Sequence, residues 1–361
     1  GCLFLRETLT RPELVELTGF SKPTVSEVIK RLRAAGLVTV VGRTSGGPGP
    51  RADVYAINPD AGYTAAVSVR EPNRLDIAIG DLRGRTRATS HQDMPGADAE
   101  SVIVSALDDA CADAGIPREL LRFVWLAVPG SYDGRDDRVR NIDVPGLGKP
   151  GLRARLAQRL GTSVRIDNDV NLAALAERHH GVGGTDGFAL LWLGEAGIGL
   201  GIDLGDGAGG GVLQGFRGAA GEIGYLPIGP AGEDSPPDLQ ELAGGPAIMD
   251  LSRAHGRPAT SARVALEAAA DDEEFLSIVA KRIAVGLASV VTVLDPALIV
   301  LAGDIGAAGA RPLADAVAEA LTHLGFHAPV SCTAVEGNAV LRGCLDAAHA
   351  ALRRDLLAEP S

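Results

Sequence analysis

Strand-like apolar runs alternate with helical stretches from residue 61 to the C-terminal end of this sequence. Predicted helices lie near 98–115 and 150–160, and glycine-rich turns follow several of the strand-like runs. Those runs are YTAAVSV (63–69), RLDIAIGDL (74–82), LRFVWLAVPG (121–130), TSVRIDND (162–169), GFALLWLG (187–194), GIGLGIDL (197–204) and ALIVLAGD (297–304). The alternation predicts an α/β body made of two lobes.

Length and composition agree with this prediction. A chain of 361 residues exceeds one ordinary hydrophobic core and predicts two or three domains. The apolar content of 46% includes only 4% aromatic residues, which indicates a core filled by Ala, Val and Leu. The net charge is −12, yet residues 1–62 carry 8 Lys and Arg against 6 Asp and Glu. A mildly basic head on an acidic body is compatible with nucleic-acid binding at one end only.

The first 60 residues predict a winged helix-turn-helix. Thr10 can cap one helix, and the turn at Gly19 separates it from a second helix capped by Ser21 and ended by Gly36. In the second helix Val25, Val28, Ile29 and Leu32 are predicted to share one buried face. Two short strands follow, at 37–42 and 52–58, joined by the Gly/Pro loop 43–51.

Such a module places the start of its second helix in the major groove of DNA, while the wing touches the backbone or the minor groove. The expected DNA contacts are Ser21, Lys22, Pro23, Thr24, Ser26 and Lys30 on the helix and Arg43 and Arg51 at the rims of the wing. The competing interpretation is a solvated helix face in a winged helix that binds protein. The basic wing favours double-stranded DNA.

The stretch RIDNDVNLAALAE (165–177) places Asp167, Asn168 and Asp169 between a strand-like run and an alanine-rich helix. One of these side chains can cap the helix, and an acid in the first turn is favoured by the helix dipole. Two carboxylates around an amide exceed what a cap needs. A ligand-binding role therefore stays open beside the capping role.

The sequence predicts no membrane span and no cofactor. The longest apolar window, Ile283 to Gly303, is interrupted by Asp295 and Pro296 and predicts a buried helix followed by a strand. The four cysteines lie far apart, which argues for a reducing cytoplasm and against a local thiolate metal site; they are Cys2, Cys111, Cys332 and Cys344.

Five ordered motifs resemble those of the ROK family, named for repressors, open reading frames and kinases. They are AVPGSYDG (127–134), DNDVNLAALAE (167–177), FRGAAGEIGYLPIG (216–229), LAGGPAI (242–248) and LDPALIVLAGDIGAAG (294–309). The resemblance covers essentially the whole chain, including the winged helix that the family's repressors carry and its sugar kinases lack. It implies a two-lobed actin-like body of the sugar-kinase and ribonuclease-H type that closes over a sugar.

The kinase phosphate loop departs from the family pattern. Family kinases begin the body with D-x-G-G-T, and the corresponding stretch here has Ser68 for the Asp, Arg70 and Glu71 for the glycines, and Pro72 for the Thr. Glu195 and Ala196 likewise alter a second phosphate turn. Since phosphoryl transfer depends on positioning and on stabilising phosphate charge, we expect no kinase activity and no catalytic residue, although Asp169 matches the family's base.

The family's zinc cluster is also missing from the sequence, because Tyr225 replaces its histidine and no cysteine follows in that segment. We therefore expect no metal. By resemblance, Asn168, Asp169 and Glu222 match sugar-contacting positions, and Asp143 is a further candidate. Tyr225 and Gln240 complete the expected ligand site; Gln240 stands where the family has a glutamate.

The leading interpretation is a DNA-binding repressor of carbohydrate-related genes that forms a dimer and senses a small carbohydrate. The expected domains are 1–60 for the head, 61–165 for a small lobe on which a C-terminal helix 345–361 packs, and 166–344 for a large lobe with the ligand cleft and dimer interface. Two alternatives stay open: an active sugar kinase with a fused head, and a regulator whose sugar site has decayed.

Overall fold

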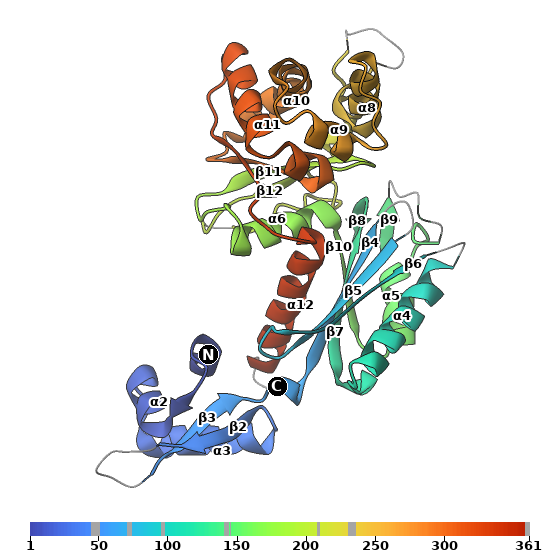
Figure 1. Cartoon of the computed structure of the whole chain (residues 1–361). Helices are drawn as coiled ribbons and strands as arrows, with labels where there is room; N and C mark the ends of the chain where they lie inside the picture. The colour runs from blue at the N-terminus through green and yellow to red at the C-terminus, as the bar shows by residue number, and fades with distance from the viewer. Residues whose placement is uncertain are drawn as a thin grey trace.

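The protein is described here from a computed structural model, which covers residues 1–44, 51–70, 74–94, 98–140, 144, 146–207, 210–229 and 236–357. Figure 1 shows three units in a row: the N-terminal head, a middle lobe built on a twisted sheet, and a second lobe at the far end of the molecule. The C-terminal helix α12 (Ala339–Leu357) runs between the head and the far lobe. The expected α/β body of two lobes behind a small head is confirmed.

Local capping explains where the helices of the head begin and end. Thr10 and Glu13 form a reciprocal capping box at the start of α2, and Ser21 accepts the backbone N–H of Thr24 at the start of α3. Gly19 ends α2 in the left-handed conformation with φ of 69°. The elements of the head are α1 (Cys2–Leu5), β1 (Leu9–Thr10), α2 (Arg11–Thr18), α3 (Lys22–Ala34), β2 (Val38–Arg43) and β3 (Asp53–Ile57), with strand order β1-β3-β2.

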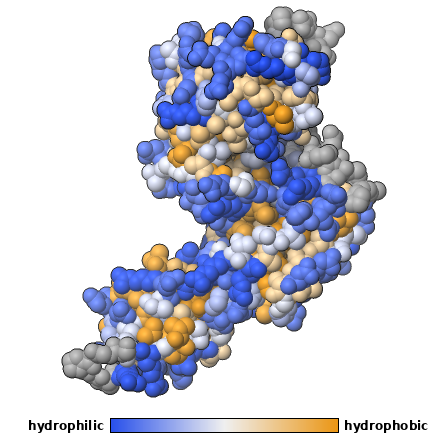
Figure 2. All heavy atoms as spheres, viewed as in Figure 1, coloured by the Kyte–Doolittle hydropathy of each residue, from blue (hydrophilic) through white to orange (hydrophobic). Residues whose placement is uncertain are grey.

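One expected core residue of the head is exposed. Val25 and Ile29 are buried, Leu32 is partly buried, and Val28 is 40% exposed, so Val28 lies at the edge of the buried face. Apolar surface is visible on the head in Figure 2. The exposed large apolar side chains of the head are Leu5, Leu17, Phe20, Val28 and Val41.

The small lobe is a five-stranded sheet in the order β10-β7-β4-β5-β6. Its strands are β4 (Tyr63–Arg70), β5 (Arg74–Asp81), β6 (Thr86–Asp93), β7 (Leu121–Val128) and β10 (Ser163–Asn168). Strands β4, β7 and β10 are parallel, which brings their carboxyl ends to one edge of the sheet. Helices α4 (Ala99–Asp113) and α5 (Leu152–Leu160) pack in one core with the sheet. The minor elements are η1 (Pro59–Ala61), η2 (Arg118–Leu120), β8 (Ser131–Asp133) and β9 (Arg138–Arg140).

The large lobe is a four-stranded sheet in the order β12-β11-β13-β14. Its strands are β11 (Phe188–Leu193), β12 (Ile198–Asp203), β13 (Ile299–Ala302) and β14 (Val330–Cys332). Helix α6 (Asp169–His180) packs through Val170 and Ala174 against this sheet. The remaining elements are η3 (Ile223–Tyr225), α7 (Leu239–Ala243), α8 (Gly245–Ala254), α9 (Ala262–Ala268), α10 (Glu273–Leu294) and α11 (Gly303–His323), and all of these helices contribute to the other core of the lobe.

The long apolar window is divided as the sequence predicts, into the end of helix α10 and strand β13. By length and composition alone, α10 could cross a membrane. Its residues Phe275, Ile283 and Leu287 are each at most 1% exposed in the core of the large lobe. This burial identifies α10 as a core helix of the lobe.

Helix α12 joins all three units. Cys344 and Ala347 pack with Ala66 of the small-lobe sheet, and Gly343 lies against α6. A Cβ atom on Gly343 would lie 1.8 Å from the carbonyl oxygen of Leu172, so only glycine permits this approach of the two helices. At the other end of α12, Leu352 is fully buried in the core of the head. The domain boundaries near residues 60 and 165 stay predictions.

Candidate functional site

The candidate recognition helix presents its polar residues to solvent. Its first hydroxyls are paired, since the Ser21 and Thr24 oxygens lie 2.8 Å apart. The Lys30 ammonium lies 4.0 Å from the Glu27 carboxylate, and both side chains are more than 60% exposed. The expected helix contacts that the structure places on this exposed face are Ser21, Lys22, Pro23, Thr24, Ser26 and Lys30. A screened pair of this kind holds Lys30 only weakly and leaves it available to a phosphate.

At the wing, Arg43 and Arg51 are both exposed, and residues 45–50 of the loop lie outside the described residues. The guanidinium of Arg43 donates to the Asp53 carboxylate across 3.2 Å, on the neighbouring strand β3. This exposed pair holds Arg43 only weakly, although Asp53 competes with a phosphate for its charge.

At the start of α6, the cap is Asn168 and not Asp169. The Asn168 side-chain oxygen accepts the backbone N–H of Asn171 across 3.1 Å, and its amide nitrogen donates to the carbonyl of Gly130 across 3.1 Å. Asp169 lies in the first helical turn and accepts the N–H of Val170 at 2.8 Å. The helix dipole favours a carboxylate there. Asn168 thus ties α6 to the loop after β7 and positions Asp169 beside it.

Glu222 is brought toward the same place by strand β12. The residue after Asp169, Val170, packs against Gly199, while the backbone carbonyl of Gly221 accepts the N–H of Leu200 across 2.8 Å. The residue before Glu222 and the residue after Asp169 therefore contact neighbouring residues of β12, Leu200 and Gly199. Burial raises the pKa of Glu222 above its usual range. A carboxyl group held in this way can exchange hydrogen bonds with a sugar hydroxyl in either protonation state.

The other expected ligand residues are placed differently. The Gln240 side-chain oxygen accepts the N–H of Ile198 across 2.7 Å, and its amide nitrogen donates to the carbonyl of Ala196 across 3.5 Å. Gln240 therefore stabilises the turn before β12 through hydrogen bonds to its backbone. Tyr225 is 61% exposed, and Asp143 lies outside the described residues.

At the position of the kinase phosphate loop, the structure places an arginine between two carboxylates. The Arg70 guanidinium lies 3.4 Å from Asp304 of the large lobe and 3.8 Å from Asp76 of the small lobe. Asp76 also accepts from the amide of Asn338 across 3.0 Å. Ser68 is 1% exposed and its hydroxyl has no hydrogen-bond partner within the described part of the chain. Residues 71–73 lie outside the described residues.

A cavity of about 340 Å³ adjoins this cluster and is lined by Arg70, Asp304, Trp192, Arg263 and Asn338, among others. Glu195, from the second altered phosphate turn, has a structural role beside it. Its carboxylate accepts the backbone N–H groups of Ala262 and Arg263, across 3.0 and 2.7 Å, at the start of α9. The cavity is thus lined by charged side chains such as Arg70, Asp304 and Arg263, and Arg263 is also held by Glu195 through its backbone N–H.

The structure adds a second, larger cavity that sequence reasoning missed. It measures about 890 Å³ and lies between β7, β10, the loop at 214–218 and the end of α12. Asp167 accepts from the Trp125 indole N–H across 3.1 Å and from the Gln214 amide across 2.5 Å, and burial raises its pKa to about 6. Asp167, the first acid of the triplet at 167–169, was the one signal of this cavity in the sequence. Its hydrogen-bond partners could not be predicted, because they lie more than 40 residues away.

Asp167 gives the fold a pH dependence of definite sign. Because its folded-state pKa is raised from 3.8 to about 6, the stabilisation by the protonated form is present below pH 3.8 and is lost as pH rises through 6. Each unit of the shift corresponds to about 1.4 kcal/mol of unfolding free energy. We expect Asp167→Asn to flatten this part of the dependence in denaturant unfolding between pH 4 and 7. Asp355→Asn, an exposed acid on the rim of the same cavity, is the control and should follow the unmodified chain. Parallel curves for Asp167→Asn and the unmodified chain would contradict the assignment.

Comparison with known proteins covers both the head and the body. Residues 73–349 match the ROK family and residues 5–47 match the MarR family. The N-acetyl-D-glucosamine kinase of Vibrio cholerae is 37% identical over 113 residues, which cover 28% of this chain and 33% of the kinase. The xylose repressor of Bacillus spizizenii is 23% identical over 241 residues, covering 63% of this chain and 59% of the repressor. This chain therefore spans only part of the length of either relative.

Solved structures extend the likeness in fold. The ROK hexokinase from Thermus thermophilus is 28% identical with a TM-score of 0.64, covering 81% of this chain and 99% of the hexokinase. A ROK family transcriptional regulator, described as a homologue of the Escherichia coli MLC protein, is 19% identical with a TM-score of 0.73, covering 93% and 90%. These matches confirm a winged helix joined to an actin-like, sugar-kinase-type body. Because the family match takes in most of the body, the chain belongs to the ROK family.

Proposed function

We propose that this chain is a DNA-binding transcriptional regulator, a repressor of carbohydrate-related genes, whose kinase-like body binds a sugar without phosphorylating it. The observation that carries the proposal is the Arg70 guanidinium between Asp76 and Asp304, where a kinase of this family has its phosphate loop. The same chain carries an exposed recognition helix.

The charges at this position disfavour phosphoryl transfer. Catalysis of that reaction depends on backbone N–H groups and a metal that hold the phosphates in line. Here Ser68 replaces the metal-binding acid of the family, and the Glu195 carboxylate is bound to the start of α9. Asp304 and Asp76 pair with the Arg70 guanidinium and so compete with a nucleotide phosphate for its charge. Asp169, at the position of the family's base, then has no phosphoryl donor to serve.

The head supports the DNA-binding part of the proposal. The N-terminal half of α3 presents Lys22, Thr24 and Ser26 without competing acids in its first turn. A winged helix docks this part of its second helix in the major groove. Among the partial relatives, the xylose repressors are named as repressors. A homodimer that presents two such helices fits a pseudo-palindromic operator.

The body supports the sugar-binding part. Asn168 and Asp169 lie at the start of α6, Glu222 is a partly buried carboxyl at the start of η3, and amide and carboxylate groups are the usual partners of sugar hydroxyls. Helix α6 packs on α12 through Gly343, and α12 reaches the core of the head through Leu352. A sugar that favours one placement of α6 therefore has a packed path to the recognition helix.

A second function, in which the body does not bind a sugar, is favoured by two observations. Gln240 uses its side chain to hold the turn before β12, and Tyr225 is 61% exposed, so neither side chain marks a closed sugar pocket. In that case the body serves for dimerisation or protein contacts. A thermal-shift panel of mono-, di- and phosphorylated sugars separates the two functions, because a ligand that binds only the folded state raises its stability.

We predict that the purified chain with ATP, magnesium and a panel of sugars produces no sugar-dependent ADP. The physical reason is the replacement of the phosphate cradle by the Arg70 cluster. A coupled assay for ADP measures this, with the Thermus thermophilus hexokinase as the positive control. Sugar-dependent turnover that Asp169→Asn abolishes would show that the body is an active kinase.

We predict that Lys22→Ala and Lys30→Ala each weaken binding to a DNA duplex. If each lysine neutralises one phosphate, each substitution makes the negative slope of log affinity against log salt shallower by about 1. Lys281→Ala, an exposed lysine on α10 of the large lobe, is the matched control and should leave both quantities unchanged. If Lys22→Ala and Lys30→Ala keep the DNA affinity and salt slope of the unmodified chain, as the control should, the DNA-binding face lies elsewhere.

A further inference from the structure

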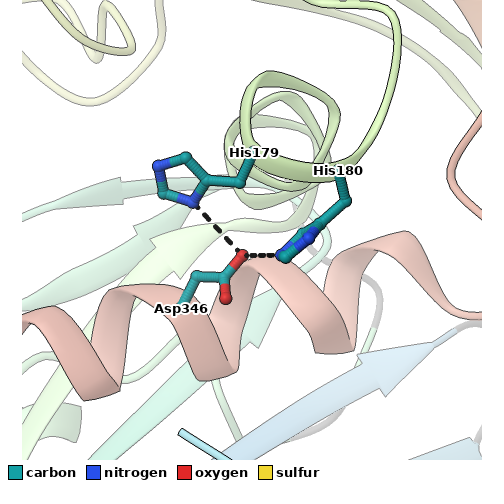
Figure 3. Close-up of side chains that lie close together, drawn as sticks. All are labelled: His179, His180 and Asp346. Carbon is teal, nitrogen blue, oxygen red and sulfur yellow. Dashed lines mark hydrogen bonds and ion pairs between the residues drawn. The ribbon is translucent and has the colours of Figure 1, made fainter. Parts of the chain in front are cut away.

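Two histidines at the end of α6 converge on one carboxylate of α12. The His179 Nδ1 atom lies 3.3 Å from Asp346 Oδ2, and the His180 Nε2 atom lies 2.8 Å from the same oxygen. Figure 3 shows both rings turned toward this oxygen from adjacent positions of one helix, with Asp346 rising from the helix below. The three side chains belong to neither the sugar-binding residues nor the recognition helix.

The arrangement has the ligand chemistry of a metal site. Imidazole nitrogen and carboxylate oxygen are ligands of zinc, with bond lengths of about 2.0–2.2 Å. Two ligands of a tetrahedral ion with such bonds lie about 3.4 Å apart. The His179 to Asp346 distance of 3.3 Å already matches this edge, and all three ligand atoms lie within 4.8 Å of one another. The distance of 2.8 Å between His180 Nε2 and Asp346 Oδ2 is shorter than this edge and must lengthen for an ion to lie between them.

Access and local charge also suit a cation. The side chains of His179, His180 and Asp346 are 44%, 31% and 25% exposed, so an ion reaches them from solvent without unfolding. The neighbouring cation, Arg178, is directed away, since its guanidinium donates to Asp203 across 2.7 and 2.9 Å. Arg178 therefore does not pair with Asp346, whose carboxylate interacts with the two imidazoles.

We propose that His179, His180 and Asp346 bind one divalent transition-metal ion, best matched by zinc, with water completing the coordination. This site was not predicted from the sequence, because Asp346 lies 166 residues after His180 and meets it only when α12 packs on α6. The expectation of no metal was based on the missing cysteine cluster, which lies in a different segment. A bound ion would link the end of α6 directly to α12.

Zinc alone is the probe for this site. Calorimetric titration of the full chain should show one zinc per chain, and His180→Gln and Asp346→Asn should each weaken it by at least about tenfold, the lower end of what even an outer-shell partner of a metal contributes. His323→Gln is the matched control, because His323 is also an exposed histidine at the end of a helix, α11. Thermal midpoints without metal check that every variant is folded.

Cobalt replaces zinc as a spectroscopic probe of the ligands. We expect visible bands of Co²⁺ bound by nitrogen and oxygen without a thiolate charge-transfer band, since the partly exposed Cys2 and Cys332 lie outside the cluster. A zinc affinity that is unchanged in both ligand variants, or that falls equally in His323→Gln, would overturn the proposal. Thiolate bands, or no zinc binding at all, would also contradict the proposal and would show that His179, His180 and Asp346 form a hydrogen-bonded cluster without a metal.

Discussion

Helix α12 approaches α6 so closely that a methyl group on Gly343 would meet the backbone of Leu172. The same helix packs Cys344 and Ala347 on the small-lobe sheet and inserts Leu352 among the core residues of the head. Head and lobes therefore share one rigid element. Under the proposed function, a change in the placement of α6 reaches the head through the packing of this helix.

At the positions that match the phosphate turns of the family's kinases, this chain carries charges that are bound within the protein. Arg70 links the two lobes through Asp304 and Asp76, and Glu195 holds the start of α9 through two backbone N–H groups. In the proposed function these contacts take the place of interactions that a kinase makes with its nucleotide. Under the proposed function, a sugar that binds one placement of the lobes more tightly shifts the body toward it.

Local signals in the sequence were enough for the elements but not for the long-range contacts. Thr10 and Ser21 predicted the starts of α2 and α3, because capping involves residues only three apart. The triplet at 167–169 could not show which residue caps α6, since Asn168 is selected by its contact with Gly130. The cluster of Arg70 with Asp304 joins residues 234 positions apart, and only the packed lobes bring them together.

The central claim is that sugar binding in the body changes DNA binding by the head. The direct measurement is operator affinity with and without the sugar that most raises the thermal midpoint, on a duplex selected from random DNA. A coupling of roughly 1 to 3 kcal/mol predicts a change of about 5- to 150-fold. Asp169→Ala and Glu222→Ala should remove this change and preserve sugar-free affinity. Equal affinity with and without the sugar, or a response that persists in both variants, would contradict the account.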